Sequence, residues 1–203
     1  MRITTGKYRG RVLKTSKEIR PTQEKVRKAV FDILGDIEGL TFLELFAGSG
    51  AIGFEAVSRG VRELTLVENN RICFELINKN IEYLQISNCM VFRLDVERAI
   101  NNFYRDKKKF DIIFLDPPYY QEIAPRLGST SLTTGSSGSR KKVGESLGKK
   151  TLQMLGAYDI LAPCGLVIVQ HFKKDNLSDS VDSLTILKQA TYGDTALTFY
   201  RKV

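Results

Sequence analysis

The groups best suited to chemistry in this chain lie at Asp116, Pro117 and Tyr119, directly after an apolar run at residues 110–115. A short apolar run that ends at two prolines is typical of a buried parallel strand, because proline cannot donate to a sheet ladder. The carboxyl edge of an open α/β sheet is where such folds bind ligands. A carboxylate, a backbone carbonyl and an aromatic ring at this edge predict a site for the exocyclic amine of a nucleobase.

A second motif, Gly48, Gly50 and Gly53, matches GxGxxG between a predicted strand and a predicted helix. A loop of this kind binds the phosphates or the sugar of a nucleotide, and the pattern alone is compatible with a dinucleotide. An NAD-dependent oxidoreductase would fit these glycines, but it would leave the residues at 116–119 unexplained.

Three acids, Glu44, Glu68 and Asp95, end three successive predicted strands and would line one crevice. A negative charge at Glu44 opposes a pyrophosphate but favours a ligand with ammonium and sulfonium groups. S-adenosylmethionine carries both, and we predict it as the cofactor, with Glu68 at its ribose diol and Asp95 at its adenine amine. Two alternatives stay open: Glu44 turns outward, or Asp95 only caps the next helix.

The elements that must position these residues alternate, which is typical of βαβ units and a parallel sheet. The patterns predict strands at 41–46, 63–67, 90–94, 110–115 and 166–172, and helices at 22–34, 51–58, 71–84, 96–104 and 147–161. A turn is expected at 162–165, and residues 184–190 and 196–201 are expected to close the sheet as an antiparallel pair.

The net charge of +8 is concentrated in two segments. Residues 1–20 hold seven basic residues and one acid, and residues 124–150 hold six and one. This favours a phosphate-backbone partner, although a solvated basic surface would also explain it. We expect a basic N-terminal arm at 1–20 and one domain at 21–203.

Eleven of the twelve residues at 128–139 are Gly, Ser or Thr. This composition predicts a flexible insert at about 124–150, which could be a lid, a tolerated insertion or a linker.

Several function classes are disfavoured. Cys73, Cys89 and Cys164 are odd in number and set in apolar neighbourhoods, so we expect reduced core cysteines of a cytoplasmic protein. The lone His171 leaves too few ligands for a zinc site, and we expect no metal. No membrane span or secretory signal is expected.

Together these motifs resemble the class I S-adenosylmethionine-dependent amino-methyltransferases and, more narrowly, the bacterial 16S rRNA guanine-N2 methyltransferase family. The narrower resemblance rests on residues 2–11, on residues 20–22 before the helix that holds Arg27, and on residues 192–195. The chain departs from the family in its long insert, in Gln170 before His171, and in Cys164 before Gly165.

The resemblance implies a Rossmann-like, doubly wound α/β fold with a mostly parallel seven-stranded sheet, an antiparallel final strand and helices on both faces. It implies a cytoplasmic monomer that acts on 16S rRNA, within small-subunit particles. A DNA adenine-N6 methyltransferase and a non-catalytic RNA-binding protein remain alternatives. The implied contacts are Glu44, Phe46, Gly48, Gly50, Glu68 and Asp95 for the cofactor; Asp116, Pro117 and Tyr119 for the target amine; and Lys7, Arg9, Arg11, Arg20, Thr22 and Arg27 for RNA.

Overall fold

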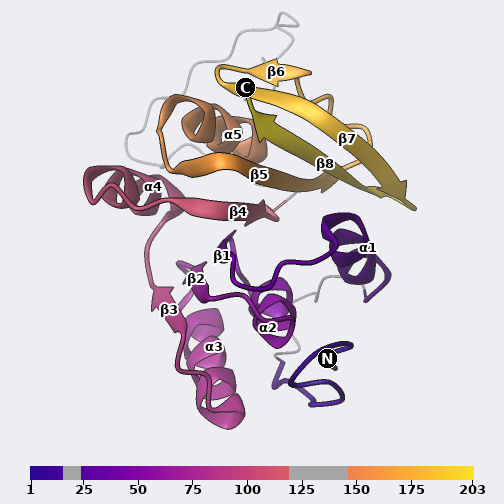
Figure 1. The fold of residues 1–203 in the computed structure, drawn as a ribbon, viewed down its shortest axis with the longest axis vertical. Helices are drawn as coiled ribbons and strands as arrows, with labels where there is room; N and C mark the ends of the chain where they lie inside the picture. Colours follow the sequence, from indigo (N-terminus) through magenta and orange to yellow (C-terminus); the bar gives the residue numbers. More distant parts are fainter. Residues whose placement is uncertain (16–23, 119–145) are drawn as a thin grey trace, which may run out of the picture.

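One mixed sheet is the frame of the molecule (Figure 1). The computed structural model describes residues 1–15, 24–118 and 146–203. Within these ranges the helices are α1 (Glu24–Leu34), α2 (Ala51–Ser58), α3 (Arg71–Leu84), α4 (Val96–Arg105) and α5 (Leu147–Ala157). The strands are β1 (Thr41–Leu45), β2 (Glu63–Val67), β3 (Cys89–Phe92), β4 (Phe110–Leu115), β5 (Leu161–Phe172), β6 (Ser180–Val181), β7 (Leu184–Tyr192) and β8 (Thr195–Lys202).

The strand order in the described part of the chain is β3-β2-β1-β4-β5-β8-β7-β6. The five neighbouring strands β3, β2, β1, β4 and β5 pair in parallel, and β8 pairs antiparallel with both β5 and β7. The Rossmann-like α/β fold and the antiparallel final strand are therefore confirmed. The sheet has eight strands rather than seven, because the two-residue β6 is too short to leave an alternating pattern in the sequence.

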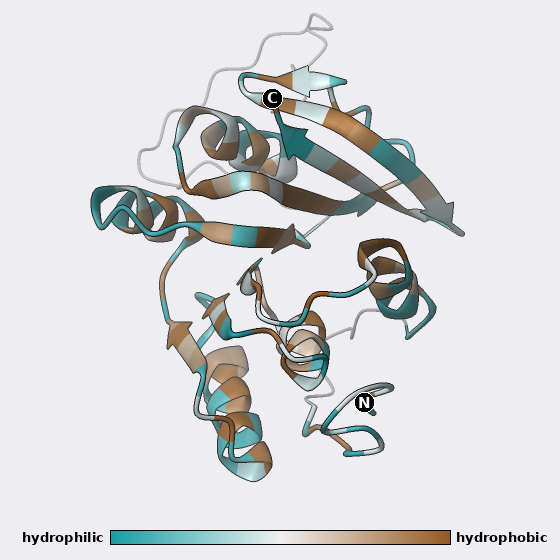
Figure 2. Ribbon diagram, viewed as in Figure 1, coloured by the Kyte–Doolittle hydropathy of each residue, from teal (hydrophilic) through white to brown (hydrophobic). Residues whose placement is uncertain are grey.

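Helices cover both faces of the sheet, as expected. Phe42 of β1 packs into a cluster with residues of α1, α2 and α3. Leu43 and Leu45 point to the opposite face and pack with α4 and α5, because successive side chains of a strand alternate. The central strands β4 and β5 are largely apolar, since both of their faces are buried (Figure 2).

The turn expected at residues 162–165 is a bulge within β5. Phe110 pairs with Leu161 and Ile112 pairs with Leu166, so the four intervening residues of β5 are left out of the ladder. This corrects one expectation about the cysteines: Cys164 lies in the bulge, exposed and with φ of 63°, whereas Cys73 is buried.

The first fifteen residues, called the arm below, fold back on themselves. Arg2 forms a β-bridge with Val12, and the amide of Gly10 donates to the carbonyl of Ile3 at 2.9 Å. Ile3 and Leu13 are buried against the domain. The boundary expected at residue 20 lies outside the described residues, so the division into arm and domain stays a prediction.

Candidate active site at the carboxyl edge of β1 and β4

The glycine loop and the residues after β4 leave the sheet side by side. β1 and β4 are parallel neighbours, with Glu44 opposite Phe114 and Leu45 opposite Leu115. In the sheet, β2 and β3 lie on one side of β1, and β5 lies on the far side of β4. The direction in which successive strands are added therefore reverses between β1 and β4. This reversal is the topological switch point, where open α/β sheets form their ligand crevice.

The loop after β1 has an unusual backbone. Phe46, Gly48 and Gly50 have φ values of 60°, 53° and 73°, all in the left-handed region. A Cβ atom on Gly50 would lie 2.8 Å from Cε2 of Phe54, so no side chain fits there. Phe46 is not a glycine, and a non-glycine residue in the left-handed region costs on the order of 1 kcal/mol of backbone strain. Strain of this kind is typical of functional loops.

Glu44 lies buried between β1 and α2. One of its carboxyl oxygens accepts a 2.8 Å hydrogen bond from the amide of Gly53. Burial raises the pKa of Glu44 to about 8, and the negative charges of Asp116 and Glu68 act in the same direction. Asp116 and Glu68 therefore lie close enough to Glu44 for their charges to act on it. Whether Glu44 meets the ligand stays a prediction.

Glu68 at the end of β2 is bound to the glycine loop. Its Oε2 accepts from the amide of Gly48 at 2.7 Å, and its Oε1 accepts from the amide of Asn70 at 2.8 Å. The acid thus joins the loop to the start of α3, and its role at a ribose stays a prediction.

Asp95 caps α4. Its Oδ1 accepts from the amide of Arg98 at 2.9 Å, and its Oδ2 lies 3.6 Å from the guanidinium of the same residue. The capping interaction that the sequence left open is therefore present. The carboxylate is half-exposed, and its proposed contact with an adenine stays untested.

Asp116 is half-buried and Pro117 is buried at the end of β4. A Cβ atom on Gly148 would lie 3.1 Å from Cγ of Pro117, so the first turn of α5 packs directly against this proline. Tyr119, Arg20, Thr22 and the insert at 128–139 lie outside the described residues.

The basic residues expected to contact RNA divide into two groups. Lys7, Arg9 and Arg11 are exposed, as an RNA contact requires. Arg27, by contrast, is 1 % exposed; it donates to the carbonyl of Arg2 at 2.8 Å. This corrects the expectation that Arg27 contacts RNA, because its position in α1 turns inward with the apolar face of that helix.

Glu55 is not among the residues that the sequence motifs point to. It lies in α2, all eight residues of which are buried. An acid in so apolar a helix had to have a buried partner, and this was the available signal. That partner is Arg27, whose Nε lies 3.6 Å from Oε2 of Glu55.

The described residues contain no cluster of His, Cys, Asp and Glu that could hold a metal ion. His171 is buried, and its Nε2 lies 2.8 Å from Oγ1 of Thr198. Burial lowers the pKa of this histidine. In the described part of the chain, none of the helices has the length and apolarity to cross a bilayer.

The strand order and the glycine loop define a Rossmann-like α/β protein of the kind seen in methyltransferase structures. The chain belongs to the family described as "Conserved hypothetical protein 95", whose model matches residues 1–131.

Individual relatives span the whole chain. This chain is 29% identical to a Bacillus subtilis protein named "Putative rRNA methyltransferase YlbH", over 100% of this chain and 99% of that protein. This chain is also 27% identical to "Ribosomal RNA small subunit methyltransferase D" of Haemophilus influenzae, over 99% of this chain and 93% of that protein. A solved structure from Escherichia coli, described as "Putative methyltransferase yhhF", superposes with a TM-score of 0.76 at 27% identity, over 100% of this chain and 97% of that one.

Proposed function

We propose that the protein transfers a methyl group from S-adenosylmethionine to the exocyclic N2 amine of a guanine in 16S rRNA. The observation that carries the proposal is the adjacency of the glycine loop and Asp116 at the switch point between β1 and β4. The names of the full-length relatives support rRNA methylation as the reaction. The guanine amine as the target is the finer part of the proposal, supported by the chemistry of the residues at 116–119.

The residues of the crevice fit S-adenosylmethionine. The glycine loop has no side chain at residue 50, because a Cβ atom there would lie 2.8 Å from Cε2 of Phe54. Burial raises the pKa of Glu44, and the negative charges of Asp116 and Glu68 beside the loop raise it further. A cationic ligand would relieve this repulsion, whereas a pyrophosphate would increase it. When bound, S-adenosylmethionine supplies an electrophilic methyl group on a sulfonium.

Asp116 and Pro117 would hold the target amine. The lone pair of a guanine amine is conjugated with the ring, so the amine is a poor nucleophile. The Asp116 carboxylate and the Pro117 carbonyl would accept its two N–H bonds and draw the nitrogen toward tetrahedral geometry. Tyr119 would stack on the base and fix its plane. Positioning of this kind lowers a barrier by several kcal/mol, and the carboxylate also stabilises the positive charge that develops on the nitrogen.

The arm would contact the RNA backbone. Lys7, Arg9 and Arg11 are exposed on it, and phosphate contacts position a nucleic acid without reading its sequence. Since pairing hides a base amine, the target guanine would be unpaired or flipped out. Small-subunit particles are the proposed substrate, and a monomer is the proposed active form.

The test is methyl transfer from labelled S-adenosylmethionine to small-subunit particles and to naked rRNA that lack the modification. Label on a guanine N2 amine that is lost in Asp116→Ala, with cofactor binding retained, is the expected result. A matched control is Asp111→Ala on β4, the strand that precedes Asp116; the Asp111 carboxylate accepts hydrogen bonds from the amide and the hydroxyl of Thr41. Label on adenine in DNA would favour the adenine-N6 alternative, and a protein that binds rRNA but not the cofactor would favour a non-catalytic role.

A further inference from the structure

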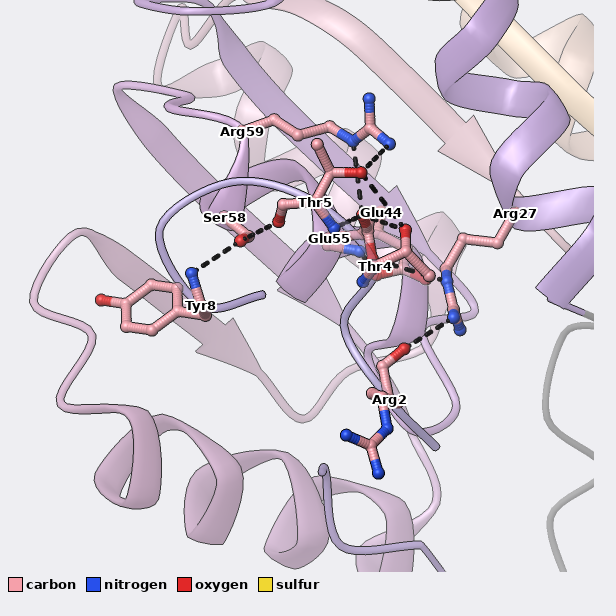
Figure 3. Close-up of polar contacts among 10 residues, drawn as sticks. Arg2, Thr4, Thr5, Tyr8, Arg27, Glu44, Glu55, Ser58 and Arg59 are labelled. Atoms are coloured by element: carbon pink, nitrogen blue, oxygen red, sulfur yellow. Dashed lines mark hydrogen bonds and ion pairs between the residues drawn. The ribbon is translucent and has the colours of Figure 1, made fainter. Parts of the chain in front are cut away.

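Glu55 is the centre of a buried polar network that holds the arm (Figure 3). Its Oε2 accepts from the amide of Thr4 at 2.9 Å, and its Oε1 accepts from the amide of Thr5 at 3.0 Å and from the hydroxyl of Thr4 at 2.6 Å. Arg27 and Arg59 approach the two carboxylate oxygens at 3.6 Å and 3.4 Å. One side chain of α2 thus fixes two consecutive amides of the arm.

Ser58, one turn further along α2, fastens the next part of the arm. Its carbonyl accepts from the amide of Lys7 at 2.8 Å, and its hydroxyl accepts from the amide of Tyr8 at 2.9 Å. A Cβ atom on Gly6 would lie only 1.7 Å from the Ser58 carbonyl oxygen, so only glycine allows this approach.

A second attachment lies on α3. The amide side chain of the buried Asn80 accepts from the amide of Lys14 at 2.8 Å and donates to its carbonyl at 3.1 Å. The arm is therefore bound at both ends, to two helices that begin at the cofactor crevice: α2 follows Gly50, and α3 follows Asn70.

Most of these attachments use the main chain of the arm. Glu55, Ser58 and Asn80 bind its amides and carbonyls, so these attachments do not use its basic side chains. The basic side chains consequently stay at the surface, at Arg2, Lys7, Arg9, Arg11 and Lys14. An arm attached in this way presents its positive charges in a fixed geometry.

The Arg27–Glu55 pair is incompletely hydrogen-bonded for a buried ion pair, which favours a role in specifying one arrangement of the chain. Among the described residues, the Nε and Nη1 atoms of Arg27 make no hydrogen bond, and burial lowers the pKa of its guanidinium. Well-packed apolar residues often stabilise a protein as much as a buried ion pair does, whereas such a pair can specify one arrangement of the chain.

We infer that Glu55 and Arg27 are positioning residues that set where the arm holds the rRNA relative to the crevice. Glu55 follows Gly53 by two residues on α2, and the amide of Gly53 binds Glu44. The same short helix therefore follows the glycine loop, binds an acid of β1 through Gly53 and carries the anchor of the arm. The inference rests on the proposed function, and neither residue needs to touch RNA or cofactor.

The test is the double substitution Arg27→Met with Glu55→Gln, which removes both charges together and avoids leaving one of them buried alone. Trypsin should cleave the arm after Lys7, Arg9 and Arg11 at least several times faster than in the wild type. The KM for rRNA should rise about tenfold, while kcat and the affinity for S-adenosylmethionine stay within about twofold. The matched control is Lys108→Met with Glu63→Gln, a half-buried pair where β2 begins, for which none of these quantities should change.

A positioning role predicts non-additivity that a general loss of stability would not produce. In a protein whose arm carries Lys7→Ala, Arg9→Ala and Arg11→Ala, the double substitution should add less than about twofold to the KM for rRNA. A full additional tenfold rise in that background, or a parallel loss of cofactor affinity in a folded protein, would overturn the inference.

A milder variant covers the case in which the double variant fails to fold. Thr4→Val removes one hydroxyl from Glu55 Oε1 and leaves α1 and α2 unchanged. It should raise the KM for rRNA about threefold and accelerate cleavage of the arm; unchanged values would overturn the inference. If the wild-type protein methylated no rRNA, the proposed function itself would be overturned. If the wild type were active and the variants had an unchanged KM for rRNA, only the role of Glu55 and Arg27 would be overturned.

Discussion

Glu44 accepts a 2.8 Å hydrogen bond from the amide of Gly53, which ties the acid at the end of β1 to the first half of α2. An amide in this part of a helix often has no partner within the helix, so the carboxyl satisfies a donor that would otherwise be buried without one. The contact needs a glycine, because a Cβ atom at residue 53 would lie 2.8 Å from the Glu44 carboxyl and 2.7 Å from Cδ2 of Leu66.

Gly53→Ala should destabilise the protein although alanine favours helices. The gain in helix propensity is about 1 kcal/mol, and overpacking against Glu44 and Leu66 costs roughly 1–3 kcal/mol. We expect a net loss of about 1 kcal/mol in the free energy of unfolding and weaker cofactor binding, measured by urea denaturation and by calorimetric titration. A variant as stable as the wild type would contradict the close packing described here.

The pH dependence of stability should carry the signature of Glu44. Its pKa is about 8 in the folded protein, compared with its ordinary value of 4.5. The folded state therefore binds a proton that the unfolded chain releases between these values. This contribution to stability is complete below about pH 4.5 and is lost as the pH rises toward 8.

Comparison with Glu44→Gln isolates this effect. Between pH 5 and pH 8.5 the wild type should lose on the order of 3 kcal/mol relative to the variant, since one pKa unit corresponds to about 1.4 kcal/mol. Urea denaturation at several pH values measures the difference. A difference between the two proteins that does not change with pH would show that Glu44 is ionised in the folded state.

Glu68→Ala should weaken cofactor binding by about 10- to 100-fold, because the amides of Gly48 and Asn70 lose a charged acceptor and the loop is no longer held. Glu68→Gln should retain part of the affinity, since its carbonyl oxygen still accepts one hydrogen bond. The matched control is Glu75→Ala on α3, an exposed acid paired only with Arg71 in the described contacts. Equal affinities for all three variants would exclude a role of Glu68 in the loop.

The three cysteines should react at very different rates. Burial raises the pKa of Cys73 to about 11 and that of Cys89 to about 12, so their thiolates are scarce at neutral pH. Cys164 is exposed in the bulge of β5. A thiol reagent should therefore modify one cysteine rapidly in the native protein, and Cys164→Ser should remove that fast phase. Rapid reaction of two or three thiols would show that α3 or β3 opens readily.

Much of the fold could be predicted because its signals are local. Residues 63–67, 71–84 and 110–115 were assigned correctly to the residue, since apolar periodicity and turn residues are properties of neighbours in the chain. The helix at 147–161 was predicted too long, because its last residues continue an apolar pattern that β5 uses instead. The bulge in β5 resembles a turn in the sequence for a similar reason: Pro163 and Gly165 indicate a break in the strand but not the path that the chain takes after it.

The sequence by itself determined which residues come to the crevice. A glycine loop after one strand and an acid–proline pair after another must meet at the carboxyl edge once those strands are parallel neighbours. Only the tertiary structure decided what each side chain does there. It turned Arg27 inward to Glu55, joined Glu68 to the amide of Gly48, and attached the arm to α2 and α3. These pairs join residues 20 to 66 positions apart, and such partners depend on how whole elements pack rather than on any local pattern.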